Sequence, residues 1–175
     1  MRIPFAVVFA VELALAASPS GGQTTPAPSD EHRHGVVARG DHVMGFDHAR
    51  TTHHFRLYGD GGAIEVAAND AADAASARQI RTHLRHIARM FSEGDFEAPM
   101  LIHDRIPPGV DVLKRKRGSI RYVFERLPSG GRVRIRTADP QALAAIHEFL
   151  RFQISDHRTG DSGAVEAEKR SRARP

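Results

Sequence analysis

Two stretches of the chain alternate apolar and polar residues on either side of a glycine-rich turn. The first predicts strands at 53–58 and 63–67, joined by a Gly-Asp-Gly-Gly turn. The second predicts strands at 120–126 and 132–136, joined by a Pro-Ser-Gly-Gly turn. Glycine adopts the positive φ angles that tight hairpins require. Each stretch therefore predicts a β-hairpin.

An amphipathic helix is predicted after each hairpin, at about 71–92 and about 140–156. Asp70 and Asp139 are suitable N-cap residues, and Pro140 suits the first helical position. Apolar residues recur at spacings of three and four in both segments, which is typical of a helix with one buried face. These apolar positions are Ile80, Leu84, Ile87 and Phe91 in the first helix and Leu143, Ile146, Leu150 and Ile154 in the second.

A ββα unit thus occurs twice, at 51–92 and 119–157, with a connecting loop at 93–118. The Pro107–Pro108 pair favours an extended chain in that loop. Two hairpins and two helices predict an α+β fold, in which a four-stranded antiparallel sheet has both helices packed on one face. The alternation in 132–136 places arginines on the other, open face.

The two ends of the chain differ in composition from this middle part. Residues 1–17 have an early arginine, an apolar run and small residues at the end, which predicts a secretory signal peptide. The alternative is a buried N-terminal helix. Residues 18–41 predict a flexible linker, 42–158 a single domain and 159–175 a disordered tail. We therefore expect a periplasmic or secreted protein that is soluble and does not span a membrane.

Histidine is the unusual component of the composition, with 11 residues in 175, whereas cysteine is absent. The absence of cysteine excludes disulfides, thiolate metal sites and cysteine nucleophiles. A metal site in this chain would therefore use imidazole, which binds zinc and copper. The predicted ligands are His42, His48, His53, His54, His83, His86 and His103.

Spacing separates these histidines into groups. His53 and His54 are adjacent, so on a strand they face opposite sides. His83 and His86 are neighbours on one helix face. His83 lies in the apolar stripe, and a packed structural role is the favoured interpretation for it and for His147. His157 is expected to interact with the dipole at a helix end.

Positive charge is the second candidate for chemistry, since the net charge is +4. Between 114 and 136, nine lysines and arginines accompany one acidic residue, Glu125. The alternative to a binding surface is a solvated cationic face. An exported protein rarely meets nucleic acid, so none is expected as a partner. The predicted anion-binding residues on the open sheet face are Arg121, Arg132, Arg134 and Arg136.

The chain has no GxSxG, P-loop or GxGxxG motif, so acyl transfer, nucleotide hydrolysis and dinucleotide binding lack support. The sequence favours a non-catalytic exported protein that holds zinc or copper through histidines. An interaction module with an anionic partner is the alternative. A small metallohydrolase is a weaker one, and the sequence does not predict an oligomeric state.

Several segments together resemble a family of small exported bacterial proteins, over about residues 42–161. The resemblance implies a single domain behind an export signal, and it implies no particular chemistry. Some members are described as aspartate carbamoyltransferases, but the Ser-Thr-Arg-Thr loop with which such enzymes hold carbamoyl phosphate is missing from this sequence. The segments that carry the resemblance include MGFD at 44–47, TTHHF at 51–55, GGAIEV at 61–66, IRTHLRHIA at 80–88, GDFEAPMLIH at 94–103, PPGV at 107–110, GGRVRI at 130–135 and AIHEFLRFQISDHRTGD at 145–161.

Overall fold

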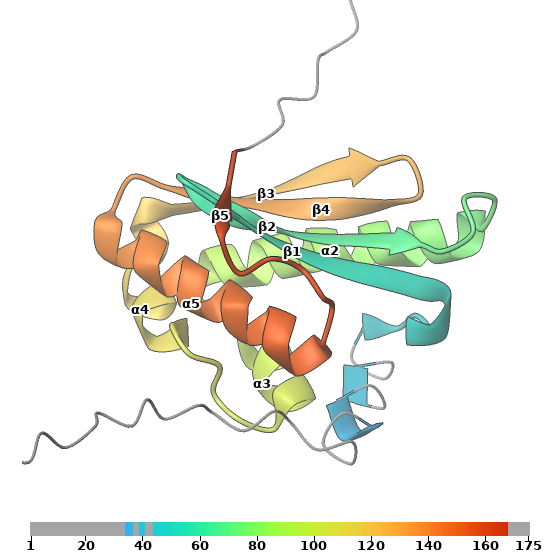
Figure 1. Cartoon of the computed structure of the whole chain (residues 1–175), viewed down its shortest axis with the longest axis horizontal. Helices are drawn as coiled ribbons and strands as arrows, with labels where there is room; N and C mark the ends of the chain where they lie inside the picture. Colours follow the sequence, from blue (N-terminus) through green and yellow to red (C-terminus); the bar gives the residue numbers. More distant parts are fainter. Residues whose placement is uncertain (1–33, 37–38, 41–43, 168–175) are drawn as a thin grey trace, which may run out of the picture.

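The structure is a computed structural model that describes residues 34–36, 39–40 and 44–167 (Figure 1). The predicted signal peptide, most of the predicted linker and His42 lie outside these residues. Two short 3-10 helices, His48–Arg50 and Arg117–Ser119, accompany the main elements. In chain order these are β1 (Thr51–Tyr58), β2 (Gly61–Ala68), α2 (Ala74–Glu93), α3 (Glu97–His103), α4 (Val110–Arg115), β3 (Ile120–Leu127), β4 (Gly130–Thr137), α5 (Pro140–His157) and β5 (Val165–Glu166).

The strands form one sheet in the order β3-β4-β2-β1-β5, which confirms the α+β class. The two predicted hairpins are present and pair through β2 and β4, so that these four strands are antiparallel. The prediction of four strands is corrected by β5, which adds a parallel edge strand beside β1 and makes the sheet mixed. This strand comes from the stretch that the sequence predicts to be a disordered tail.

One hydrophobic core lies between the sheet and the helices (Figure 1). Helix α2 packs mainly on β3 and β4, while α5 packs on β1 and β2. Alternate strand residues point into this core, as a half-buried sheet requires. They are Phe55, Leu57, Ile64, Val66, Val133 and Ile135, and all six are buried.

The two long helices begin at aspartate caps. Asp139 Oδ1 accepts hydrogen bonds from the first backbone N–H groups of α5, and Pro140 occupies its first turn, as predicted. Helix α2 starts later than predicted, because Asp73 rather than Asp70 is its cap and accepts a 3.0 Å hydrogen bond from Ser76 N. Asp70 instead forms a tight turn just before the helix.

The stretch 93–118, predicted as a loop, contains α3 and α4. Pro99 is compatible with α3 because it lies in the first turn, where no backbone donor is required. Both helices are short and are held by tertiary contacts, since Ile102 and Leu113 are buried in the common core. The extended chain that the Pro107–Pro108 pair predicts is limited to the connection between them.

After α5 the chain turns back along the free edge of β1. The carboxylate of Asp161 accepts a 3.0 Å hydrogen bond from Phe55 N and lies 2.9 Å from Nδ1 of His54. Arg56 Nη1 lies 3.3 Å from the same carboxylate. Exposed strand edges carry unpaired backbone donors, and this carboxylate together with β5 covers those of β1.

Just after the turn of the first hairpin, β2 leaves no space for a side chain at Gly62. A Cβ atom there would lie 2.2 Å from Leu150 Cδ1 and 2.5 Å from Arg56 O. We expect Gly62→Ala to lower the free energy of unfolding by about 1–3 kcal/mol, because the core must shift to accept it. Gly59→Ala, in the same turn, meets no atom within 4 Å and is the matched control. Chemical denaturation measures both, and equal stabilities would contradict the packing at Gly62.

Candidate functional site

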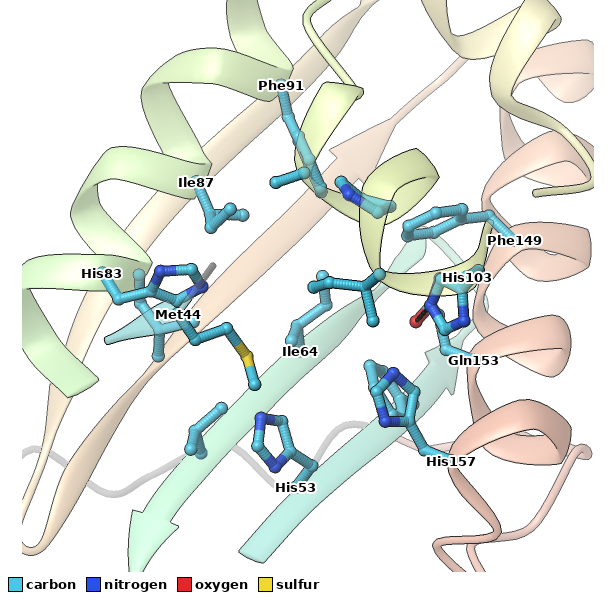
Figure 2. Close-up of a pocket in the computed structure, with 16 residues that line it drawn as sticks. Met44, His53, Ile64, His83, Ile87, Phe91, His103, Phe149, Gln153 and His157 are labelled. Carbon is cyan, nitrogen blue, oxygen red and sulfur yellow. Dashed lines mark hydrogen bonds between the residues drawn. The ribbon is translucent and has the colours of Figure 1, made fainter. Parts of the chain in front are cut away.

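A largely apolar pocket lies between the sheet and helices α2, α3 and α5 (Figure 2). Its interior volume is about 60 Å³. Most of its wall consists of aliphatic and aromatic side chains of the core. The remaining lining side chains come from five different parts of the chain and are Met44, His53, His83, His103, Gln153 and His157.

Local structure explains why histidines reach this pocket. On β1 the alternation places His53 on the same side as Phe55, toward the helices. His83 lies on the face of α2 that carries Leu84 and Ile87, as its position in the apolar stripe predicts. His157 follows Leu150 by two helical turns, so it lies on the buried face of α5.

The imidazole rings contact one another. His53 stacks on His48 and on His157, with ring centroids 5.2 and 5.9 Å apart. His157 also meets His103 edge to face at 5.0 Å. His83 joins this group through Phe46, whose ring contacts both His53 and His83. We call the five residues the histidine cluster: His48, His53, His83, His103 and His157.

Removal from water keeps His53, His83 and His157 uncharged at neutral pH. Burial, helped by the nearby His48 and His83, lowers the pKa of His53 from 6.5 to about 3. Burial also lowers the pKa of His83 to about 4 and holds the pKa of His157 well below its ordinary value. A metal ligand must be an unprotonated imidazole, and at neutral pH these rings satisfy that requirement.

His53 has an unmet hydrogen-bonding requirement. Its Nε2 is buried and has no hydrogen-bond partner among the described residues. A buried polar atom without a partner costs about 1–3 kcal/mol of stability. A residue with a purely structural role would avoid this cost, so the atom marks His53 as the strongest candidate ligand in the pocket.

His103 differs from His53, because both of its ring nitrogens are engaged. Nδ1 lies 2.6 Å from Oδ2 of Asp156, and Nε2 lies 2.9 Å from the Gln153 amide. Arg105 holds the second oxygen of Asp156 at 2.7 Å. Burial lowers the pKa of His103, while Asp156 opposes that effect. His103 therefore supports the wall of the pocket and offers no free lone pair.

The structure separates the remaining predicted ligands from the pocket. His54 lies on the open face of the sheet beside Asp161. His86 is exposed on α2, with Nδ1 3.3 Å from Arg89 Nη2. The predicted set lacks His157, although its seven-residue spacing from Leu150 was a signal that it shares the buried face of α5.

The described residues contain no group of three or more histidine or carboxylate side chains placed to hold a metal ion. Structural zinc sites present four ligands and catalytic ones three. Such a ready-made site is therefore missing from this part of the chain. A metal in the pocket would need ring rotations or a ligand of another kind.

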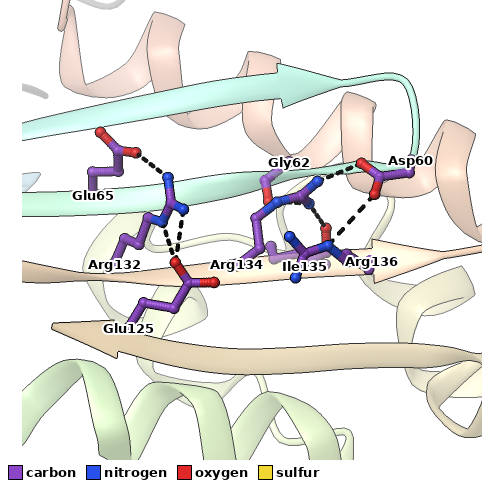
Figure 3. A network of polar contacts seen from close by, with 8 residues as sticks. All are labelled: Asp60, Gly62, Glu65, Glu125, Arg132, Arg134, Ile135 and Arg136. Atoms are coloured by element: carbon purple, nitrogen blue, oxygen red, sulfur yellow. Dashed lines mark hydrogen bonds and ion pairs between the residues drawn. The ribbon is translucent and has the colours of Figure 1, made fainter. Parts of the chain in front are cut away.

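On the opposite face of the sheet, three of the four predicted anion-binding arginines are paired with carboxylates (Figure 3). Arg132 donates to Glu125 at 2.7 Å and lies 3.5 Å from Glu65. These pairs arise because the β2–β4 and β3–β4 registers place each glutamate opposite Arg132.

Arg134 and Arg136 share one carboxylate, that of Asp60 in the first hairpin turn. Arg134 is fully buried, lies 4.7 Å above the Tyr58 ring and donates to Gly62 O at 3.1 Å. Arg121, on β3, is exposed. Three of the four arginines are therefore paired with carboxylates on this face, and anion binding by the set stays a prediction.

Comparison of the chain with family models, curated proteins and solved structures gives no match. Within residues 34–36, 39–40 and 44–167, no helix has both the length and the apolar character needed to cross a membrane. Function is therefore inferred from the chemistry of the pocket.

The low pKa values of His53 and His83 predict that the folded protein loses stability in acid. Unfolded histidines titrate near 6.5, whereas His53 and His83 titrate at about 3 and about 4 in the folded protein. The unfolded state therefore binds more protons below pH 6.5, so stability falls as the pH drops from about 6.5 to about 4. The expected slope is about 1.4 kcal/mol per pH unit for each such histidine.

Denaturation of the protein in buffers that span this pH range measures the slope. His53→Leu should reduce the slope of stability against pH by about 1.4 kcal/mol per pH unit, the contribution of one histidine. It should also raise stability at neutral pH by about 1 kcal/mol, because it removes the unpartnered nitrogen. Constant stability across this range would show that the rings are not buried uncharged.

Proposed function

We propose that this protein is a non-catalytic exported binding protein that holds a transition-metal ion, zinc or copper, in the pocket of the histidine cluster. The observation that carries the proposal is the buried Nε2 of His53, which lacks a partner among the described residues and lies beside other uncharged imidazoles. A metal ion would satisfy this nitrogen, which the described residues leave unsatisfied.

The arrangement of donors supports this function. His53, His83 and His157 belong to β1, α2 and α5, so a bound ion would link three separate elements of the fold. Their lone pairs are available at neutral pH, because burial disfavours protonation of each ring. The ion would be shielded from water by the apolar wall, which strengthens its interaction with each nitrogen.

A hydrolytic enzyme is less well supported. Among the described residues that line the pocket, none has a carboxylate or a hydroxyl group. Hydrolysis at a metal requires an open coordination position and a general base other than the metal ligands, whereas the histidines of this pocket are proposed ligands or, at His103, already hydrogen-bonded. The alternative of an anionic partner is also weaker, since Arg132, Arg134 and Arg136 already have carboxylate partners. The proposed export rests on the predicted signal peptide alone.

A thermal-shift experiment tests metal binding by the full chain. A ligand present at about 100 times its Kd stabilises the folded state by about 2.7 kcal/mol, which raises the melting temperature by several degrees. We expect Zn²⁺ or copper to produce this rise and His53→Leu to abolish it. His54→Gln, which changes the neighbouring residue on the opposite sheet face, should retain it. Unchanged melting with every such metal would refute the proposal.

A further inference from the structure

We infer that the ion is copper(I), held by the thioether of Met44 together with the imidazoles of His53 and His83. This inference rests on the proposed function and specifies which ion the pocket accepts. The thioether of Met44 is a ligand of a different type from the histidine and carboxylate side chains considered above. It requires no electron transfer, because copper is bound in its reduced state.

Met44 is placed where a ligand would be needed. Its side chain is 9% exposed and lines the pocket with both histidines. Figure 2 shows its sulfur between the rings of His53 and His83. Phe46, two residues further along, fixes this segment over the same two rings, with centroids 5.9 Å from His53 and 5.5 Å from His83.

The donor set fits copper(I) better than zinc. Thioether sulfur is a soft, uncharged ligand that selects copper(I), whereas zinc takes thiolate, imidazole or carboxylate and needs three or four protein ligands. A soft monovalent ion is satisfied by two or three donors. Two imidazoles and one thioether meet that need without the three-residue group that zinc requires, which the described part of the chain lacks.

The charge of the pocket leads to the same choice. The described lining residues include no carboxylate that could neutralise a cation. The cost of transferring an ion into an apolar medium is large and grows with the square of its charge, so a divalent ion costs about four times as much as a monovalent one. A pocket with only neutral donors therefore discriminates against Zn²⁺.

An outer cleft borders this site. Met44 and His83 also line an outer cleft with Arg78, Thr82 and His86 on α2. The two proposed ligands thus stand between the cleft and the buried pocket, and the exposed His86 is available to an arriving ion. Arg78, the charged side chain of the cleft, repels a divalent cation more strongly than a monovalent one.

Anaerobic titration of the full chain with copper(I) bicinchoninate tests the inference, with Zn²⁺ binding measured in parallel. We expect the protein to withdraw one copper(I) per chain from the coloured complex. Met44→Leu should weaken copper(I) binding at least about tenfold and leave the melting temperature of the metal-free protein unchanged, because leucine has a similar volume. Met90→Leu is the matched control, since Met90 packs on the core outside the pocket.

X-ray absorption on the copper-loaded protein gives a second measurement. It should detect a sulfur ligand that disappears in Met44→Leu. Copper(I) affinity that is unchanged in Met44→Leu but lost in His53→Leu would overturn the thioether ligand and leave metal binding intact. Zinc binding without copper(I) binding would likewise overturn only this inference. Failure of the wild-type chain to bind either ion would refute the proposed function as well.

Discussion

Transfer of imidazole rings from water into the space between the sheet and its helices favours their uncharged form, and the site depends on this desolvation. The apolar wall that lowers the pKa of His53 and His83 is the same core that joins α2 and α5 to the sheet. Folding therefore also brings the imidazoles of His53 and His83 into the uncharged form that can bind a metal ion. The Nε2 of His53 has no partner among the described residues, and the buried side chains of this core surround it.

Local patterns were sufficient to predict the repeated part of the fold. Alternation of apolar residues and glycine turns determine both hairpins, and the apolar stripes and aspartate caps determine both long helices. The short elements have no such signal. Helices α3 and α4 form because Ile102 and Leu113 reach the core, and β5 forms beside an edge that Asp161 already covers.

The site was predictable to the extent that it follows from periodicity. Adjacent residues on a strand face opposite ways, and this places His53 and His54 on different faces. The environment of each ring depends on contacts between distant segments, which one sequence does not reveal. The partners of His103 come from α5, and Arg134 is buried because strand register brings it to the turn that holds Asp60. The missed His157 shows that a helix end can still belong to the core.

Asp161 connects the two sides of the sheet. It belongs to the segment that follows α5, yet it binds the ring of His54 and the backbone of Phe55, the two residues that follow His53 on β1. The position of a ring inside the pocket is thus set in part by a carboxylate outside it. The described part of the C-terminal segment supplies no donor to the pocket, but it holds β1, the strand that carries His53. A change that displaces Asp161 would therefore alter the position of His53 in the pocket, because Asp161 is hydrogen-bonded to the strand on which His53 lies.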